Sequence, residues 1–312
     1  MRALFIITRT NEMHKHYESF SCLGHEIKTY VFSHIRQPVA GFAQGDKLDA
    51  EIYKAANEYK PDLIVYVGAC NGNIPSSKLF AKIKAEVCPT VLFCSDAADT
   101  PWWDILKVYE EAGSFTLQVA LDGNKEWPFH DKHLTALTPI DPARFPNPPI
   151  PHKDRKVHFG FAGNINGFAM IDGEKRGRRP LIAEMIQFGL EYRDRDREEV
   201  VDSYQKAADF MSQVCMIPNF PSTGSHMRMH VKGRVIEAGL AGCMLMERKN
   251  SPTHDWFEPG IDYVEWQEPD DVRQMIERIT PEESQIFGWR LREKVMVNHS
   301  AEKFWQRILN RI

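Results

Sequence analysis

Residues 232–247 read KGRVIEAGLAGCMLME, a helical segment that leads directly into a strand. The spacing of apolar residues predicts a helix near Lys232–Leu240, and the short apolar run predicts a strand over Met244–Glu247. Gly239 permits close packing of the helix. We expect Gly242 to end it, because glycine readily adopts the left-handed backbone found at helix ends. A helix followed at once by a buried strand is typical of α/β proteins.

The same alternation extends in both directions along the chain. The predicted strands are Ala3–Ile7, His25–Phe32, Leu63–Val67, Thr90–Cys94, Thr116–Ala120, Leu134–Leu137, Lys156–Phe161, Val214–Pro218, Met244–Glu247 and Tyr263–Trp266. The predicted helices are Lys47–Tyr59, Ser76–Ala85, Pro180–Phe188, Val200–Gln213, Lys232–Leu240, Asp270–Arg278 and Pro281–Ile312, with one more entered from Arg9–Phe20. Strands that are apolar almost throughout, and separated by helices, indicate parallel sheets covered on both faces.

A proline-rich segment divides this pattern into two halves. Residues 138–153 read TPIDPARFPNPPIPHK and hold six prolines without periodicity, which is typical of a semi-rigid connector. A length of 312 residues also suits two domains better than one core. We therefore predict two doubly wound α/β domains, over residues 1–150 and 151–294, with residues 295–312 as a closing helix.

Composition excludes several classes of protein. A net charge of -4 and a pI near 6.3 give no footprint for indiscriminate nucleic-acid binding. The chain shows no apolar run of membrane length and no secretory signal, and its six cysteines form no CxxC pair. We expect a cytoplasmic protein with reduced thiols and no membrane span, as a monomer or a homodimer.

Open parallel sheets bind ligands at the carboxyl ends of their strands, so two facing sheets predict a ligand site in a central cleft. Dehydrogenases, periplasmic-type binding proteins and glycosyltransferases share this architecture. The turn FAGNING at Phe161–Gly167 lacks the full G-x-G-x-x-G spacing, which argues against an NAD enzyme. Gly163 and Asn164 in this turn are candidates for contact with a phosphate or a sugar, although an ordinary strand-to-helix turn explains them equally well.

A family resemblance narrows the choice. The segment KGRVIEAGLAG from Lys232, the later FEPG at Phe257–Gly260 and the closing segment Val295–Ile312 resemble the nucleotide-sugar-binding half of GT-B glycosyltransferases. They are most similar to the CgeB-like (spore-maturation protein-like) group, related to glycosyltransferase families 1 and 4. The resemblance implies a GT-B fold: two Rossmann-like domains facing a central cleft, with the final helix packing back toward the first domain. Residues Lys60–Val65, Pro89–Asp96 and the pair Asp141-Pro142 match more loosely.

The resemblance also implies roles for donor-binding residues. Glu237 occupies the position that binds the ribose hydroxyls in the family, and a carboxylate can accept both diol protons. Arg234 lies one helical turn earlier, and with Lys232 it can neutralise the leaving diphosphate. Gly233 and Ser225 lie toward the helix start, where the helix dipole favours an anion. GT-B enzymes generally need no metal, so we expect neither a metal nor a cofactor besides the donor.

Histidines and basic residues offer weaker signals. His226 and His230 have i,i+4 spacing, but no HExxH glutamate or further ligand accompanies them, so a metal site is disfavoured. The basic loop Glu174–Arg179 (EKRGRR) suits a solvated surface better than a phosphate clamp.

Acceptor chemistry is predicted on the first domain. Asp96 and Asp99 follow the strand Thr90–Cys94, and either could serve as the general base for an acceptor hydroxyl if the enzyme inverts configuration. The alternative is helix capping, which the Asp and Thr-Pro pattern also suits. The neighbouring Trp102 and Trp103 could stack on a sugar or base ring.

A second acceptor-side segment follows the first strand. Arg9 and His14 lie in the loop Arg9–His16, which we expect to open toward the cleft.

These features predict a glycosyltransferase that moves a sugar from a UDP- or GDP-type donor to a hydroxyl of a glycan, protein, metabolite or modified DNA base. The acidic total charge makes DNA a minority option. A catalytically inactive nucleotide-sugar or carbohydrate-binding protein, or a nucleotide-sugar epimerase of the same fold, are the alternatives.

Overall fold

The chain folds into two compact α/β units. The first comprises Met1–Asp122, Glu126–Ala136 and Ala301–Ile312, and the second comprises Gly123–Lys125 and Leu137–Ser300. The proline-rich segment thus belongs to the second unit. The computed structural model describes residues 1–8, 16–33, 41–68, 72–95, 102–123, 125, 133–163, 168–171, 174–193, 203–222 and 228–312.

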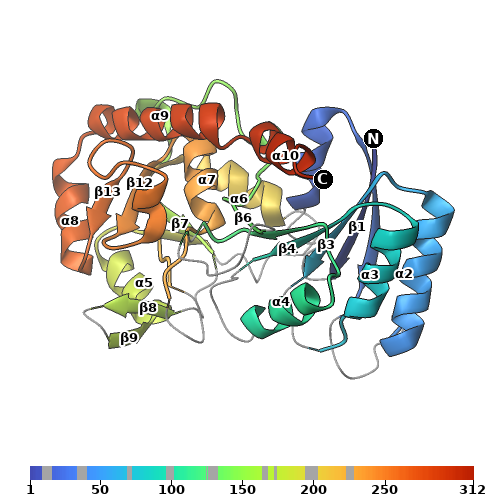
Figure 1. The fold of residues 1–312 in the computed structure, drawn as a ribbon. Helices are drawn as coiled ribbons and strands as arrows, with labels where there is room; N and C mark the ends of the chain where they lie inside the picture. Colours follow the sequence, from blue (N-terminus) through green and yellow to red (C-terminus); the bar gives the residue numbers. More distant parts are fainter. Residues whose placement is uncertain are drawn as a thin grey trace. The chain divides into compact units, whose positions relative to one another are not determined.

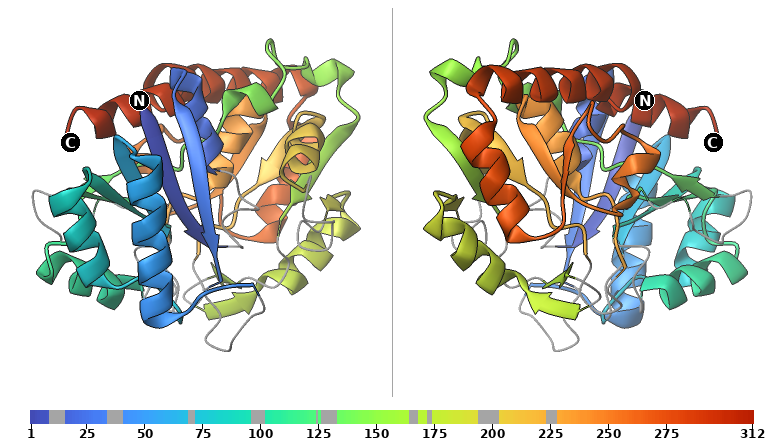
Figure 2. Two further views of the ribbon diagram at one scale, coloured as in Figure 1. Left: turned by 90° about the vertical axis from the view of Figure 1, so that its right-hand side faces the viewer. Right: turned by 90° about the vertical axis from the view of Figure 1, so that its left-hand side faces the viewer.

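The first unit is built on a parallel sheet. Among the described residues it has six strands in the order β2-β1-β3-β4-β5-β6. The strands are β1 (Arg2–Thr8), β2 (Glu26–Phe32), β3 (Leu63–Gly68), β4 (Thr90–Cys94), β5 (Leu117–Ala120) and β6 (His133–Thr135). The helices are η1 (His16–Leu23), α2 (Gly45–Tyr59), α3 (Ser77–Glu86), α4 (Trp102–Glu111) and α10 (Ala301–Leu309). β1 and β2 run side by side in the same direction (Figure 2).

Alternate residues of these strands enter two different cores. Leu4 and Ile64 pack with the apolar faces of α2 and α3, whereas Phe5 and Val65 pack with η1 and α10. Because successive side chains of a strand point to opposite faces, a strand that is apolar throughout can serve both layers. The predicted parallel sheet with two covered faces is confirmed.

The second unit repeats this plan. Among the described residues its main sheet has five parallel strands in the order β10-β7-β11-β12-β13, and a hairpin β8-β9 stands apart from it. The strands are β7 (Val157–Ala162), β8 (Phe168–Ile171), β9 (Glu174–Gly177), β10 (Glu191–Arg193), β11 (Val214–Pro218), β12 (Met244–Arg248) and β13 (Val264–Trp266). The helices are η2 (Pro142–Arg144), η3 (His152–Asp154), α5 (Arg178–Gln187), α6 (Ser203–Met211), α7 (Gly233–Ala241), η4 (Pro252–Asp255), α8 (Pro269–Arg278) and α9 (Pro281–Asn298). The hairpin and β10 were not predicted from the sequence.

Helices cover both faces of this second sheet as well. One core joins the sheet to α6, α7 and α9, and the other joins it to α5 and α8. The strand order reverses between β7 and β11, since β7 has the later strand β10 on one side and β11 on the other. Such a reversal leaves a crevice at the carboxyl ends of the two strands, the usual ligand position of doubly wound sheets.

Close approach between α7 and α9 depends on glycines. A Cβ on Gly239 would lie 2.7 Å from Cγ2 of Val295, and a Cβ on Gly288 would overlap the carbonyl group of Gly242. Gly242 adopts φ 69°, and its N–H bonds to the Gly239 carbonyl, so it ends α7 as predicted. The two helices lie side by side in Figure 1.

The C-terminal segment, predicted as helical over Pro281–Ile312 with residues 295–312 as a closing helix, forms two helices. α9 ends at Asn298, with His299 as its C-cap, and α10 begins at Ala301. α10 belongs to the first unit, where the Trp305 indole N–H donates to Ser19 Oγ at 3.0 Å. Within the described residues, no helix is both long enough and apolar enough to cross a membrane.

Replacing Gly288 with alanine should destabilise the second unit. The added methyl group meets backbone atoms of Gly242, which cannot rotate away, so we expect Gly288→Ala to lower the free energy of unfolding by about 1–3 kcal/mol. Urea denaturation measures the change. Gly233→Ala is the matched control, since its Cβ would lie 3.6 Å or more from Thr138, and its stability should not fall. Equal losses in both variants would contradict the packing argument.

A buried histidine adds a pH dependence to the fold. His152 Nε2 lies 2.7 Å from the Gly242 carbonyl oxygen, and its Nδ1 lies 2.7 Å from Ser284 Oγ. Burial, and next the charge of Arg155, lower the pKa of His152 from 6.5 to about 4. Between these values the unfolded chain binds a proton that the folded chain does not, so stability falls as the pH falls.

We expect this histidine to account for a loss of up to about 3 kcal/mol between pH 7 and pH 4. Denaturation of wild type and His152→Gln at both pH values isolates its share. The wild type should lose more stability on acidification than the variant. The same loss in both proteins would show that His152 does not titrate in this way.

Candidate functional site

Three aromatic rings form a row along one face of the second sheet, near the carboxyl ends of its strands. Phe161 lies in β7, Phe220 follows β11 and Trp266 ends β13. The centroids of Phe161 and Phe220 are 5.2 Å apart, those of Phe220 and Trp266 are 5.7 Å apart, and both pairs meet edge to face. The row therefore starts at β7 and β11, where the strand order reverses.

Each ring of this row carries an arginine. The pairs, with the distance from the guanidinium carbon to the ring centroid, are Arg234 and Phe161 (4.4 Å), Arg178 and Phe220 (5.4 Å), and Arg248 and Trp266 (5.0 Å). Guanidinium groups stack favourably on aromatic faces and stay protonated in proteins. Burial lowers the pKa of Arg178, but arginine remains charged at neutral pH. The row is therefore a concentration of positive charge at one end of the sheet.

A glycine leaves room for the first of these arginines. A Cβ on Gly163 would lie 2.9 Å from Nη2 of Arg234. The Gly163 N–H donates to the Arg193 carbonyl at 3.1 Å, and the Tyr192 hydroxyl donates to the Gly163 carbonyl at 3.0 Å. These bonds fix the backbone at the end of β7 against the guanidinium of Arg234.

Helix α7 brings a carboxylate to the same arginine. Arg234 Nε lies 3.9 Å from Glu237 Oε2, and the two side chains are only 9% and 5% exposed. The pair lies in the first half of the helix, which begins at Gly233 after the N-cap Lys232. A buried carboxylate beside a buried guanidinium provides both an acceptor for hydroxyl groups and a partner for an anion.

At the opposite end of α7, two arginine side chains donate hydrogen bonds to the last carbonyl groups of the helix. Arg155 Nη2 donates to the Ala241 carbonyl at 2.7 Å, and Arg292 Nη1 donates to the Leu240 carbonyl. Cations near a helix C-terminus interact favourably with the helix dipole. The negative end of the dipole is thus compensated within the protein, while the positive end lies at the aromatic row with Arg234.

The structure brings part of the predicted donor set together. Gly163, Arg234 and Glu237 lie at one place, with Lys232 and Gly233 at the start of the same helix. The predicted residues Arg9, His14, Asp96, Asp99, Asn164 and Ser225 lie outside the described residues. Trp102 and Trp103 begin α4, and only their backbone is described.

Sequence reasoning missed two of the three arginines. Arg178 was assigned to a solvated basic loop, whereas its guanidinium lies over Phe220. Arg248 was not singled out. One signal in the sequence could have pointed to these arginines. Phe161, Phe220 and Trp266 all lie at or just beyond the end of a predicted strand, and large aromatic rings at such positions usually pack against another side chain.

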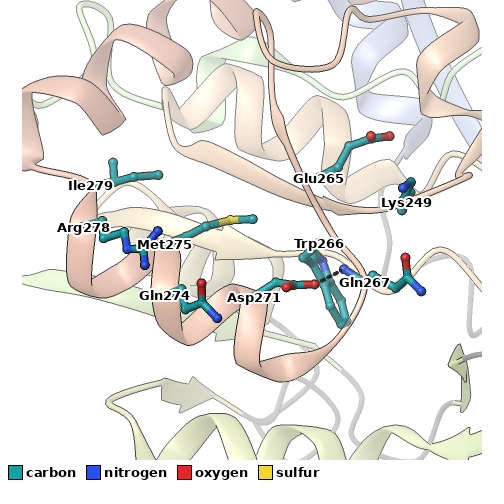
Figure 3. A pocket seen from close by; sticks show the side chains of 9 residues that line it. All are labelled: Lys249, Glu265, Trp266, Gln267, Asp271, Gln274, Met275, Arg278 and Ile279. Atoms are coloured by element: carbon teal, nitrogen blue, oxygen red, sulfur yellow. Dashed lines mark hydrogen bonds between the residues drawn. The ribbon is translucent and has the colours of Figure 1, made fainter.

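An open pocket of about 610 Å³ lies beside the last strand of the same sheet (Figure 3). Its lining residues are Lys249, Glu265, Trp266, Gln267, Asp271, Gln274, Met275, Arg278 and Ile279. Asp271 Oδ2 accepts hydrogen bonds from the Gln267 and Glu268 N–H groups at 2.9 Å and so caps α8. The charged side chains are of both signs, so the pocket does not favour one charge in a ligand.

Comparison with known sequences finds a family model that matches the second half of the chain. Residues 169–310 match the model of a glycosyl transferase-like family. The matched part contains Arg178, α7 and Arg248, and therefore all three arginines of the row. No curated protein sequence matches the chain.

Solved structures resemble the whole chain. A crystal structure of Anabaena HepE in complex with UDP and glucose has a TM-score of 0.62 at 13% identity, over 99% of this chain and 98% of that one. Sucrose-phosphate synthase from Thermosynechococcus elongatus gives 0.63 at 10% identity, over 100% and 98%. UDP-GlcNAc 2-epimerase from Neisseria meningitidis bound to UDP-GlcNAc gives 0.53 at 11% identity, over 99% and 100%. At such low identity these likenesses concern the fold alone, and they confirm that the two parallel-sheet units form a GT-B fold.

Proposed function

We propose that the protein transfers a sugar from a nucleotide-diphosphate sugar, of the UDP or GDP type, to a hydroxyl acceptor. The observation that carries this proposal is the pair Arg234 and Arg178, which lie over aromatic rings at the strand reversal, with the buried Glu237 on the adjoining helix. The match of residues 169–310 to a glycosyl transferase-like family supports it. The UDP in the crystal of HepE, which shares the fold, favours a UDP-type donor.

The donor's two recognisable parts fit the two kinds of group at the site. A diphosphate is met by guanidinium groups and by a helix N-terminus, which Arg234, Arg178 and the start of α7 supply. A ribose diol is met by a carboxylate, and Glu237 is the buried carboxylate beside Arg234. We assign the remaining donor contacts to Lys232, Gly233, Ser225, Gly163 and Asn164.

Transfer breaks the bond between the anomeric carbon and the diphosphate oxygen. Negative charge then develops on the leaving nucleoside diphosphate, and the arginines can stabilise it without a metal ion. In an inverting reaction the acceptor oxygen forms the new bond to the anomeric carbon while a base removes its proton. We propose Asp96 for this base, with Asp99 as the second candidate. A retaining reaction would not need that base.

Acceptor binding is assigned to the first unit. Trp102 and Trp103 are proposed to stack on an acceptor ring, and Arg9 and His14 to contact its polar groups. The acceptor is a glycan, a protein, a metabolite or a modified DNA base, and the CgeB-like resemblance is consistent with any of them. We propose that the protein acts in the cytoplasm.

Donor binding can be tested at Glu237 and Arg178. Glu237→Gln keeps the shape but weakens acceptance of the ribose protons, and Arg178→Ala removes one charge from the row. We expect each to weaken binding of UDP or GDP by roughly 10- to 100-fold in calorimetry, the range for hydrogen bonds to charged groups. The neighbouring exposed Arg179→Ala is the matched control and should change affinity less than about twofold. Unchanged binding in Glu237→Gln would end the ribose assignment.

Turnover is tested by incubating the protein with UDP- and GDP-sugars and a panel of hydroxyl acceptors. Transfer releases free nucleoside diphosphate together with a glycosylated product, and we expect Asp96→Asn to lower kcat by about 100-fold or more. Donor binding without release would indicate a binding protein. Conversion of the donor to a sugar epimer would indicate an epimerase instead. Full turnover by Asp96→Asn would remove Asp96 from the mechanism.

A further inference from the structure

A buried glutamate joins three elements of the second unit. Glu247 in β12 is fully buried, and its Oε2 accepts hydrogen bonds from Asn219 Nδ2 at 2.8 Å and from Thr253 Oγ1 at 2.9 Å. Its Oε1 accepts from the Arg248 N–H at 2.8 Å. Asn219 follows β11 and Thr253 lies in η4. One carboxyl group therefore fixes the ends of two neighbouring strands and the turn after the second.

The two partners of Glu247 at the strand ends adjoin the aromatic row. Asn219 precedes Phe220, the middle ring, and Arg248 carries the third guanidinium. Phe220 packs in the core on the α5 and α8 face, whereas Ile217 and Leu245, two residues before Asn219 and Glu247, pack on the α7 and α9 face. Since side chains alternate along a strand, Glu247 holds the row from the opposite face of the sheet, through the backbone.

Glu247 can change its charge near neutral pH. Burial raises the pKa of Glu247 to about 7, against the opposing effect of its three hydrogen-bond donors. Glu265 on β13 raises it slightly further, and the Tyr263 phenol also faces it. Asn219 and Thr253 are neutral, and Arg248 presents its backbone N–H. The Glu247 side chain is therefore mainly ionised above about pH 7 and mainly protonated below it.

Protonation changes the hydrogen bonds that the Glu247 side chain can make. With a proton on Oε2, Glu247 donates to Thr253 Oγ1, and the threonine hydroxyl turns toward Ser251 Oγ at 3.0 Å. The bonds from Asn219 Nδ2 and the Arg248 N–H then lose the charge of their acceptor. Hydrogen bonds to an ionised acceptor are roughly twice as strong as those to a neutral one. The ends of β11 and β12 are consequently held less firmly.

We propose that Glu247 is a positioning residue of the donor site, whose carboxylate aligns Phe220 and Arg248, so that donor binding weakens when this carboxylate takes up a proton. Phe220 in turn supports the guanidinium of Arg178. The inference rests on the proposed function, because it assigns the aromatic row to the diphosphate.

Binding of UDP-glucose to the full-length protein at pH 6 and pH 8 tests this. UDP-glucose is suitable because its diphosphate is esterified at both ends and lacks the ionisation near pH 6 of a terminal phosphate. For the wild type we expect affinity to fall about fivefold from pH 8 to pH 6, at the low end of typical coupling between two sites. Glu247→Gln should show less than about a twofold change.

Two further variants test whether the midpoint of the pH dependence of binding follows the pKa of Glu247, which a purely structural role would not predict. Thr253→Val removes one donor to the carboxylate, so the midpoint of the pH dependence should shift to higher pH. Glu265→Gln is the matched control, because it removes a neighbouring charge but none of the three bonds. It should keep the wild-type fold-change, with a midpoint at slightly lower pH.

Amide hydrogen exchange of Asn219, Phe220, Ser222, Arg248 and Lys249 supplies a readout that needs no donor. After correction for the intrinsic rates, wild type should be better protected at pH 8 than at pH 6, and Glu247→Gln should not. A pH dependence of UDP-glucose binding that is the same in Glu247→Gln would overturn the positioning role while leaving the donor site intact. Absence of UDP-glucose and GDP-sugar binding at either pH would instead overturn the proposed function, and this inference with it.

Discussion

The second unit depends on one constraint, the fixed position of helix α7 against its neighbours. The helix carries Arg234 and Glu237 at one end, while its last carbonyl groups accept hydrogen bonds from Arg155 and Arg292. Glycines at the contact with α9 remove the side chains that would keep the two helices apart. Hydrogen bonds and close packing thus fix the far end of the helix and, with it, the direction in which the near end extends. At the near end, the Arg234 guanidinium lies against Gly163 at the end of β7, with Glu237 beside it.

The aromatic row shows how a sheet can hold positive charge where two of the three guanidinium groups, those of Arg234 and Arg248, are buried. Three guanidinium groups close to one sheet edge would repel one another and lose hydration. Each lies over the face of a ring, which compensates part of that cost and fixes the plane of the group. The rings in turn pack edge to face, so the spacing of the charges is set by apolar contacts. The packing of the aromatic core thus also determines where the positive charges lie in this unit.

Local sequence patterns predicted the sheets well and the site only in part. β4 and β11 were predicted residue for residue, because each is a short apolar run with polar or proline residues at its ends. β9 was missed because its residues, EKRG, are charged and are typical of a surface loop. The role of Arg178 was missed for a related reason. Its contact with Phe220 joins residues far apart in the chain, and no local period reveals such a contact. Glu237 was found through a family resemblance rather than through its spacing, and its role stays a prediction.

The break between α9 and α10 has a consequence for exchanging one unit of the chain with that of a related protein. α10 supplies Phe304, Trp305 and Ile308 to the core of the first unit, although it follows the second unit along the chain. A single cut near the middle of the sequence would remove α10 from the first unit and leave η1 to cover that face of the sheet without it. Grafting a different donor-binding half onto this first unit would therefore need two junctions, one before Leu137 and one at Ser300, with the final helix retained as part of the host. Recombination between relatives at the linear midpoint alone would instead cover this first unit with the final helix of the other parent, whose side chains were not selected to pack there.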